Sequence, residues 1–159
     1  MIGVHDDTYF MRAALIEAQN AFDDDEVPIG CVIVHDNRII ARGHNQVERL
    51  RDATAHAEMI ALTQAEAALS SKWLNECTVY VTIEPCLMCA YACVLARIQR
   101  LVYGAPEPRT GAMESTVNVL QLGVNHTFSA TGRILEAECA YLMQEFFKRK
   151  RAEKKVTNG

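Results

Sequence analysis

Two short stretches, Thr54-Ala55-His56-Ala57-Glu58 and Glu84-Pro85-Cys86-Leu87-Met88-Cys89, decide how the fold and the chemistry of this chain are interpreted. Together they read as H-x-E followed by P-C-x-x-C. Two thiolates and one imidazole suit zinc, which prefers four tetrahedral ligands of this softness. We therefore predict that His56, Cys86 and Cys89 bind one zinc ion per chain.

The local sequence predicts where these ligands lie. Cys86 and Cys89 are three residues apart and would share one face of a helix, with Pro85 at its first position. Unpaired N–H groups at a helix start lower the pKa of a thiol and so favour the thiolate that binds metal. Thr54 is expected to be the N-cap of a second helix, whose start carries His56.

Three protein ligands leave one zinc position open for water, which distinguishes a catalytic site from a closed structural one. Glu58 lies two residues after His56, where its carboxylate can carry protons without binding the metal. Cys93, four residues after Cys89, could instead close the site as a fourth ligand. We prefer core packing for Cys93, because a closed site would leave Glu58 without a water. The alternative that Cys86 and Cys89 are themselves buried core thiols stays open.

The length of 159 residues fits a single domain, residues 1–159, that ends in a basic helix end at about 148–159. No apolar run approaches the roughly 18 residues of a membrane span, and the N-terminus lacks the basic start and apolar centre of a signal peptide. We therefore expect a cytoplasmic protein that does not bind membranes. Its six cysteines are then expected to be reduced thiols or metal ligands rather than disulfides.

Residues 148–155 concentrate basic charge at one end of an acidic chain. They contain six lysines and arginines and one glutamate, whereas the whole chain has a net charge of −4. Such a cluster can bind phosphates even in an acidic protein and would indicate a nucleic-acid partner. A solvated helix end, where cations suit the helix dipole, explains the cluster equally well.

Hydrophobic periodicity predicts an α/β fold that begins with an amphipathic helix over Asp7–Asn20. The other predicted elements are, in chain order, a hairpin of strands 31–34 and 38–42, a helix from His56 to about Leu69, a strand 77–83, a helix from Pro85 to about Ala96, a strand 101–104, a short strand or turn 117–122, and a final helix from about Ile134 that buries Leu135, Leu142, Met143, Phe146 and Phe147. We therefore predict a three-layer α/β/α architecture with a mixed five-stranded sheet.

These motifs make the chain similar to the zinc-dependent cytidine/deoxycytidylate deaminase superfamily, and within it to the bacterial tRNA-specific adenosine deaminases. The resemblance runs from about Tyr9 to Arg151 and includes Glu26-Val27-Pro28-Ile29-Gly30, both zinc motifs, Thr110-Gly111-Ala112 and Phe146-Phe147-Lys148. It implies a cytidine deaminase-like fold, one zinc ion, and hydrolytic deamination of adenosine to inosine at the wobble position of the tRNA anticodon. It also implies a homodimer with tRNA bound across it.

The resemblance further implies roles for individual residues. His56, Cys86 and Cys89 would hold zinc, and Glu58 would move protons from the attacking water to the ring and the leaving amine. Asn45 would hydrogen-bond the purine. The other residues implied around the substrate are Val27, Pro28 and Ile83 as apolar walls, Glu26 beside them, and Glu107 and Arg109 of a loop. The tRNA backbone would be bound by Lys148, Arg149, Lys150 and Arg151.

Three alternatives remain open from the sequence. Glu107 stands where many relatives have Asp, so it could be an exposed loop carboxylate instead of a contact to the nucleotide beside the target base. The same zinc chemistry would also serve a deaminase of a free base or nucleoside, such as guanine, cytosine or cytidine. A noncatalytic, zinc-stabilised RNA-binding module is the third alternative, and it predicts Cys93 as a fourth ligand.

Overall fold

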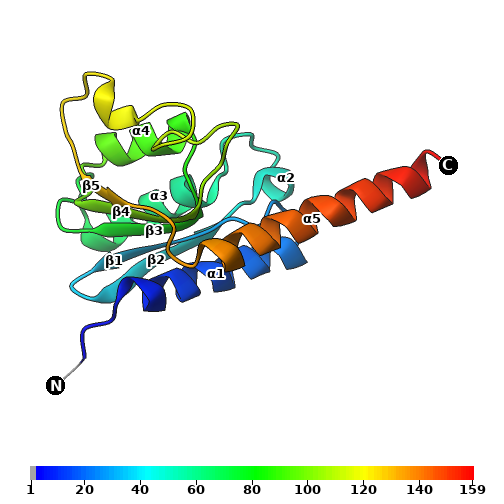
Figure 1. The fold of residues 1–159 in the computed structure, drawn as a ribbon. Coiled ribbons are helices and arrows are strands. Elements are labelled where there is room, and N and C mark those ends of the chain that lie inside the picture. The colour runs from blue at the N-terminus through cyan, green and yellow to red at the C-terminus, as the bar shows by residue number, and fades with distance from the viewer. Residues whose placement is uncertain (1–2) are drawn as a thin grey trace.

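The computed structural model describes residues 3–159, which form a five-stranded sheet and the helices around it (Figure 1). In chain order the elements are α1 (Asp7–Asp23), β1 (Gly30–His35), β2 (Arg38–His44), α2 (Val47–Leu50), α3 (Ala57–Leu69), β3 (Thr78–Ile83), α4 (Leu87–Leu95), β4 (Arg100–Ala105), the 3₁₀ helix η1 (Val119–Gln121), β5 (Ser129–Thr131) and α5 (Glu136–Thr157). The strand order in the sheet is β2-β1-β3-β4-β5.

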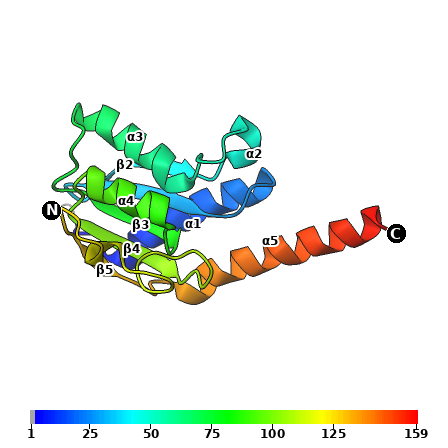
Figure 2. The ribbon, with the colours of Figure 1, turned by 90° about the horizontal axis from the view of Figure 1, so that it is seen from above.

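The sheet is mixed, as predicted. Strand β1 runs antiparallel to both β2 and β3, whereas β4 runs parallel to β3 and to β5. Helices α1 and α5 cover one face of the sheet, and α3 and α4 cover the other (Figure 1 and Figure 2). The predicted three-layer α/β/α architecture with a mixed five-stranded sheet is therefore confirmed.

The central strands are buried on both faces, and their successive residues belong to two different cores. Val32 of β1 and Tyr80 of β3 pack in the cluster that includes residues of α1 and α5. Their neighbours Ile33 and Val79 pack in the cluster that includes residues of α3 and α4. Successive side chains of a strand point to opposite faces, which explains why these strands read as continuous apolar runs.

Strand direction brings the starts of two helices to the same edge of the sheet. Strands β2 and β3 both run antiparallel to β1, so they point the same way. Helix α3 follows β2 after the short helix α2, and α4 follows β3 after three residues. The N-termini of α3 and α4 therefore meet beyond the carboxyl ends of these strands, where α/β sheets place their ligands.

Gly30 allows helix α1 to pack directly on β1. A Cβ atom at this position would lie 2.0 Å from the carbonyl oxygen of Ala14 and 2.4 Å from the backbone nitrogen of Ala18. Both are backbone atoms of α1, so a rotated side chain could not relieve the overlap. A glycine within a strand often marks such a close approach, and here the approaching element is α1.

The fifth strand lies elsewhere than predicted. Residues 117–122, expected to be a short strand or turn, contain the single-turn helix η1. Strand β5 is Ser129–Thr131 instead, and two of its three residues are exposed. A strand of three small or polar residues has no hydrophobic period that the sequence could reveal.

Helix α5 begins later than predicted and buries fewer of its apolar residues. It starts at Glu136, after Leu135 at a φ of 54°, in the left-handed region that interrupts a helix. Phe146 is buried, but Phe147 is 42% exposed. The predicted burial of Phe147 is therefore wrong. Adjacent helical residues are rotated by about 100°, so only one of the two rings can face the core.

The C-terminal part of α5 extends beyond the sheet (Figure 1 and Figure 2). This helix has 22 residues, and its last turns carry the basic cluster predicted from the sequence. Between residues 3 and 159, no helix combines the length and the apolar character needed to cross a membrane.

Candidate active site

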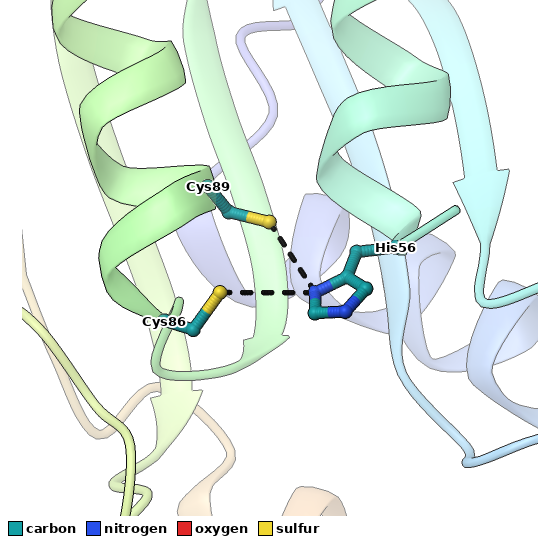
Figure 3. Close-up of side chains that lie close together, drawn as sticks. All are labelled: His56, Cys86 and Cys89. Carbon is teal, nitrogen blue, oxygen red and sulfur yellow. Dashed lines mark hydrogen bonds between the residues drawn. The ribbon is translucent and has the colours of Figure 1, made fainter. Parts of the chain in front are cut away.

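The three predicted metal ligands lie together at the edge of the sheet where α3 and α4 begin (Figure 3). The Nδ1 atom of His56 is 3.7 Å from the sulfur of Cys86 and 3.5 Å from the sulfur of Cys89. One ligand atom from each residue lies within 4.8 Å of the others. Within residues 3–159, this is the group of His, Cys, Asp and Glu side chains that is close enough to hold a metal ion.

Two of the ligands occupy helix caps. His56 is the N-cap of α3 and Cys86 is the N-cap of α4, each with an extended backbone, while Cys89 lies in the first turn of α4. The predicted cap at Thr54 is therefore wrong, and Pro85 precedes the cap instead of starting the helix. The preferred N-cap residues have side chains that accept a hydrogen bond from a backbone N–H of their own helix. The side chains of His56 and Cys86 make no such bond and face each other instead, so cap preferences could not locate these two helix starts.

The chemistry of this donor set fits a divalent cation. The pKa of the Cys86 thiol is lowered to about 4, because hydrogen bonds from Cys89 and His56 outweigh the effect of burial. The pKa of the Cys89 thiol is raised, because the neighbouring Cys86 and burial disfavour a second thiolate, and Glu58 adds to this effect. A cation between the two sulfurs would offset this repulsion and allow both cysteines to ionise.

Glu58 lies in the first turn of α3, and its carboxyl group is buried beside the ligands. Burial is the main reason that the pKa of this carboxyl is raised. Its Oε1 atom has no hydrogen-bond partner among residues 3–159. Buried polar atoms normally have a partner, so this oxygen is suited to bind a water or a polar group of a substrate.

Cys93 is fully buried in the apolar core between the sheet and the helices α3 and α4. The pKa of its thiol is raised by this burial. Its place in the core agrees with the preference for packing over metal binding, and Cys93 is not part of the group formed by His56, Cys86 and Cys89.

An open groove of about 1300 Å³ runs past the ligand cluster. His56, Glu58 and Cys86 lie on its wall, together with most of the side chains predicted to surround the substrate, which are Glu26, Val27, Asn45, Ile83, Glu107 and Arg109. Pro28 is an exception, because it is buried and does not line the groove. The structure therefore brings residues from distant parts of the sequence into one open groove.

The groove also contains residues that the sequence analysis did not assign to the site. Helix α5 contributes Met143, Phe146 and Phe147, and the segment before α4 contributes Glu84. The helical spacing of three and four residues in α5 could have indicated a shared face, but it gave no indication of what that face contacts.

A family comparison agrees with this geometry. The model of the MafB19-like deaminase family matches residues 5–151, which is most of the chain. The chain belongs to this deaminase family. The resemblance stated from H-x-E and P-C-x-x-C is thereby confirmed.

Individual members of this deaminase group are similar over most of the chain. The tRNA-specific adenosine deaminase of Aquifex aeolicus (strain VF5) is 44% identical over 90% of this chain and 95% of its own length. The chloroplastic tRNA(adenine(34)) deaminase of Arabidopsis thaliana is 46% identical over 89% of this chain, which spans 12% of that protein. A solved structure from work on A-to-I editing by tRNA:A34 deaminases at the wobble position of transfer RNA has a TM-score of 0.82 and 46% identity. The match covers 85% of this chain and 99% of the chain in that structure.

In this deaminase, Glu26 holds helix α2, which forms part of the wall of the groove. Its two carboxylate oxygens each accept a 2.9 Å hydrogen bond, one from the backbone N–H of Glu48 and one from that of Arg49. These residues belong to helix α2, the short helix between β2 and α3. Both oxygens of Glu26 are thus occupied by the protein itself, and the residue shapes the groove by holding α2.

The four basic residues predicted to bind tRNA are not equivalent in the structure. Arg149 lies over the ring of Phe22 at 4.4 Å and pairs with Asp25 at 3.0 Å, and Lys150 pairs with Asp25 at 2.6 Å. Lys148 and Arg151 are exposed. Only Lys150 and Arg151 of the four line the groove. A pair between residues more than 120 positions apart gives no local sequence signal.

Proposed function

We propose that this protein is a zinc-dependent hydrolase that converts adenosine to inosine in tRNA, at the wobble position of the anticodon. The observation that carries the proposal is the buried, unpartnered carboxylate oxygen of Glu58 beside the ligand cluster of His56, Cys86 and Cys89. The similarity to tRNA-specific adenosine deaminases supports tRNA as the substrate. The match to the Aquifex aeolicus enzyme covers 95% of that protein, so the similarity extends over nearly its whole length.

The ligand set favours zinc over other common divalent ions. Thiolates are soft ligands, which magnesium and calcium bind poorly, and one histidine with two cysteines is a known zinc donor set. When bound, zinc activates a water molecule as a nucleophile at neutral pH. His56, Cys86 and Cys89 would hold the ion, and both cysteines would bind as thiolates.

Glu58 would act as the proton carrier. Its position in the first turn of α3 places the carboxyl near the ligand cluster without making it one of the three ligands. It would take one proton from the attacking water and deliver it to the adenine ring. It would then take the second proton from the hydroxyl group newly attached to the ring and deliver it to the departing amine, which leaves as ammonia.

The groove offers contacts that suit a purine within a polymer. The Asn45 amide would hydrogen-bond the base, between apolar contacts from Val27 and Ile83. Glu107 and Arg109 would contact nucleotides beside the target. The groove continues to α5, where Lys150 and Arg151 would bind phosphates, with Lys148 and Arg149 nearby in the helix.

We further propose that the chain works as a cytoplasmic homodimer. Leu87, Tyr91 and Leu95 recur every four residues along α4 and are 48%, 46% and 62% exposed. Residues four apart lie on one helical face, so they form an apolar stripe suited to a second copy. Sedimentation of the pure protein as a monomer at micromolar concentration would contradict the dimer.

The activity is tested with a tRNA that carries adenosine at the wobble position. We expect the zinc-loaded protein to convert this adenosine to inosine, as detected by nucleoside analysis of the digested tRNA. The Glu58→Gln variant serves as a matched control. Deamination of free guanine, cytosine or cytidine without any action on tRNA would replace the proposal by a small-molecule deaminase. A protein that binds RNA and zinc but deaminates none of these substrates would be a noncatalytic module.

A further inference from the structure

The loop of residues 106–116 connects β4 to the segment before η1 and forms one side of the groove. Glu107, Arg109 and Thr110 of this loop line the groove. The carboxylate of Glu107 accepts a 3.0 Å hydrogen bond from the backbone N–H of Arg109, so these two residues are held relative to each other.

Glu84 supplies most of the attachment of this loop. Its side chain is buried, with 2% of its surface exposed. Oε2 accepts hydrogen bonds from the backbone N–H groups of Met113, Glu114 and Ser115 at 2.9, 2.8 and 3.0 Å. Oε1 accepts one from the backbone N–H of Glu107 at 3.0 Å and one from the hydroxyl of Ser115. A single carboxylate therefore holds both ends of the loop.

These partners require an ionised carboxylate. Four are backbone N–H groups, which can only donate, and both oxygens of Glu84 accept at least one of these bonds. An ionised carboxylate is the side-chain group of this size that offers acceptors at both positions and no donor. Hydrogen bonds to a charged acceptor are also stronger than bonds to a neutral one.

The same arrangement joins the loop to the segment that carries a metal ligand. Gly111 forms an isolated antiparallel bridge with Cys86, and the N–H of Ala112 donates to the carbonyl oxygen of Pro85 at 2.8 Å. A Cβ atom at Gly111 would lie 2.3 Å from the carboxyl carbon of Glu84, so only glycine permits this packing. The loop, Glu84 and the backbone of Cys86 thus form one connected unit.

We propose that Glu84 is a positioning residue that fixes the 106–116 loop and thereby sets where Glu107 and Arg109 meet the nucleotides beside the target base. The identity of the substrate rests on the proposed function, whereas the attachment of the loop does not. Glu84 acts through the loop backbone and leaves the chemical step to Glu58. Its removal therefore affects the binding of an RNA substrate more than the turnover of the bound substrate.

Glu84→Gln tests the attachment directly. The glutamine keeps one acceptor oxygen, which best serves the three N–H groups at residues 113–115, and its NH₂ group then faces the N–H of Glu107. We expect the Glu107 amide hydrogen to exchange with solvent roughly 10- to 100-fold faster than in the wild type, as measured by NMR. Exchange at the central strand β3 should stay unchanged, because the loop opens locally.

Asp7→Asn is the matched control for a general loss of stability. Asp7 also accepts several charged or hydroxyl hydrogen bonds, but its partners are Arg100 and Tyr80, outside the loop. This variant should leave the exchange at Glu107 unchanged relative to other loops. Ser115→Ala, which removes one of the five bonds, serves as a second variant if Glu84→Gln does not fold, and should raise the same exchange rate by a smaller factor.

Kinetics on an RNA hairpin with the target adenosine in its loop test the functional part. We expect Glu84→Gln to raise KM by about tenfold, the effect of losing roughly one positioned contact, with a smaller change in kcat and unchanged zinc content. Asp7→Asn should alter neither constant. Wild-type exchange at Glu107 in both loop variants, or an unchanged KM for the hairpin, would overturn the inference. A wild-type protein that is inactive on RNA would instead refute the proposed function, and the exchange measurement would still decide the attachment.

Discussion

The side-chain oxygen of Asn45 accepts a 2.8 Å hydrogen bond from the backbone N–H of Ala57, the first residue of α3. This bond satisfies one of the free N–H groups at the start of the helix that follows His56. It also uses only the oxygen of the Asn45 amide, so the NH₂ group is left for a substrate in the groove. One side chain therefore supports the ligand helix with one atom and is available to a base with another.

Two substitutions at this position separate the two roles. Asn45→Asp keeps an acceptor for Ala57, and its charge is favourable near a helix N-terminus, so thermal stability should change little. Loss of the NH₂ donor should lower kcat/KM by about 10- to 100-fold. Asn45→Ala should lose this activity and, in addition, about 1 to 2 kcal/mol of stability. Equal stability of the two variants in denaturant unfolding would show that the bond to Ala57 contributes nothing.

Glu58→Gln should abolish catalysis while the metal stays bound. The amide has nearly the size of the carboxyl but cannot carry protons, and positioned proton carriers typically contribute 10²- to 10⁴-fold. We therefore expect inosine formation to fall by at least about 10²-fold, with close to one zinc per chain in elemental analysis. Loss of zinc in this variant would instead make Glu58 a metal ligand.

Removal of the metal should destabilise the protein, because metal binding is coupled to folding. A chelator should lower the melting temperature of the wild type, and Cys86→Ser should abolish zinc binding and the response to chelator together. Cys93→Ser is the matched control, since Cys93 lies in the apolar core and outside the ligand group. A Cys93→Ser protein without zinc would support the closed site of a noncatalytic module.

The sequence predicted most of the layered fold because the buried strands and the amphipathic helices carry strong hydrophobic periods. Strands β1 and β3 were located to within one residue at each end. Strand β5 was placed wrongly, because residues 129–131 contribute little to either core and their pairing with β4 depends on backbone atoms. Phe147 was misjudged for a related reason, since a helical pattern does not tell which of two adjacent rings faces inward.

The candidate site shows a similar division. His56, Cys86 and Cys89 could be predicted because metal chemistry restricts both the residue types and their spacing. The bonds of Glu26 to α2 and of Glu84 to the loop could not, because their partners are backbone N–H groups, which every residue except proline has. The pairing of Arg149 with Asp25 depends on how α1 and α5 pack, and this is a property of the complete fold.

The ion pair between Asp7 and Arg100 makes the stability of the fold depend on pH in the acidic range. Two bonds of 2.7 and 2.6 Å from Arg100, more than offsetting the opposing effect of burial, lower the pKa of Asp7 below its ordinary value of 3.8. The unfolded chain therefore binds this proton more readily. The pair stabilises the fold fully above about pH 5, and this stabilisation is lost as the pH falls through the lowered pKa.

The loss of stability caused by Asp7→Asn, measured against the wild type at the same pH, should consequently be larger at neutral pH than in acid. We expect the variant to be about 1 to 3 kcal/mol less stable at pH 7, the usual effect of a charged hydrogen bond. This difference should shrink in urea unfolding as the pH is lowered below about 4. A difference that is constant between pH 7 and pH 3 would show that the charge of Asp7 is not involved.

Salt dependence distinguishes the roles of the basic residues of α5. Arg151 and Lys154 line the groove and are exposed, whereas Lys148 is exposed but lies outside the groove. If the first two bind phosphates, the double variant Arg151→Gln/Lys154→Gln should flatten the log–log slope of tRNA binding against salt by roughly 1.4 to 1.8. Lys148→Gln, as the single-site control, should leave the slope nearly unchanged. An equal change in slope per substituted residue in the two variants would indicate general attraction of RNA to the helix end.

The strand order of the sheet also bears on how the protein is synthesised. Strand β3 lies between β1 and β4, so the first half of the chain can form the β1–β2 hairpin with α1 and α3 before its central neighbour exists. Cys86 follows His56 by 30 residues, which at about 5 to 20 residues per second corresponds to roughly 1.5 to 6 seconds of translation. During this interval the nascent chain presents a single ligand of the cluster. A metal ion would therefore find its complete ligand set only after β3 and the start of α4 have been synthesised.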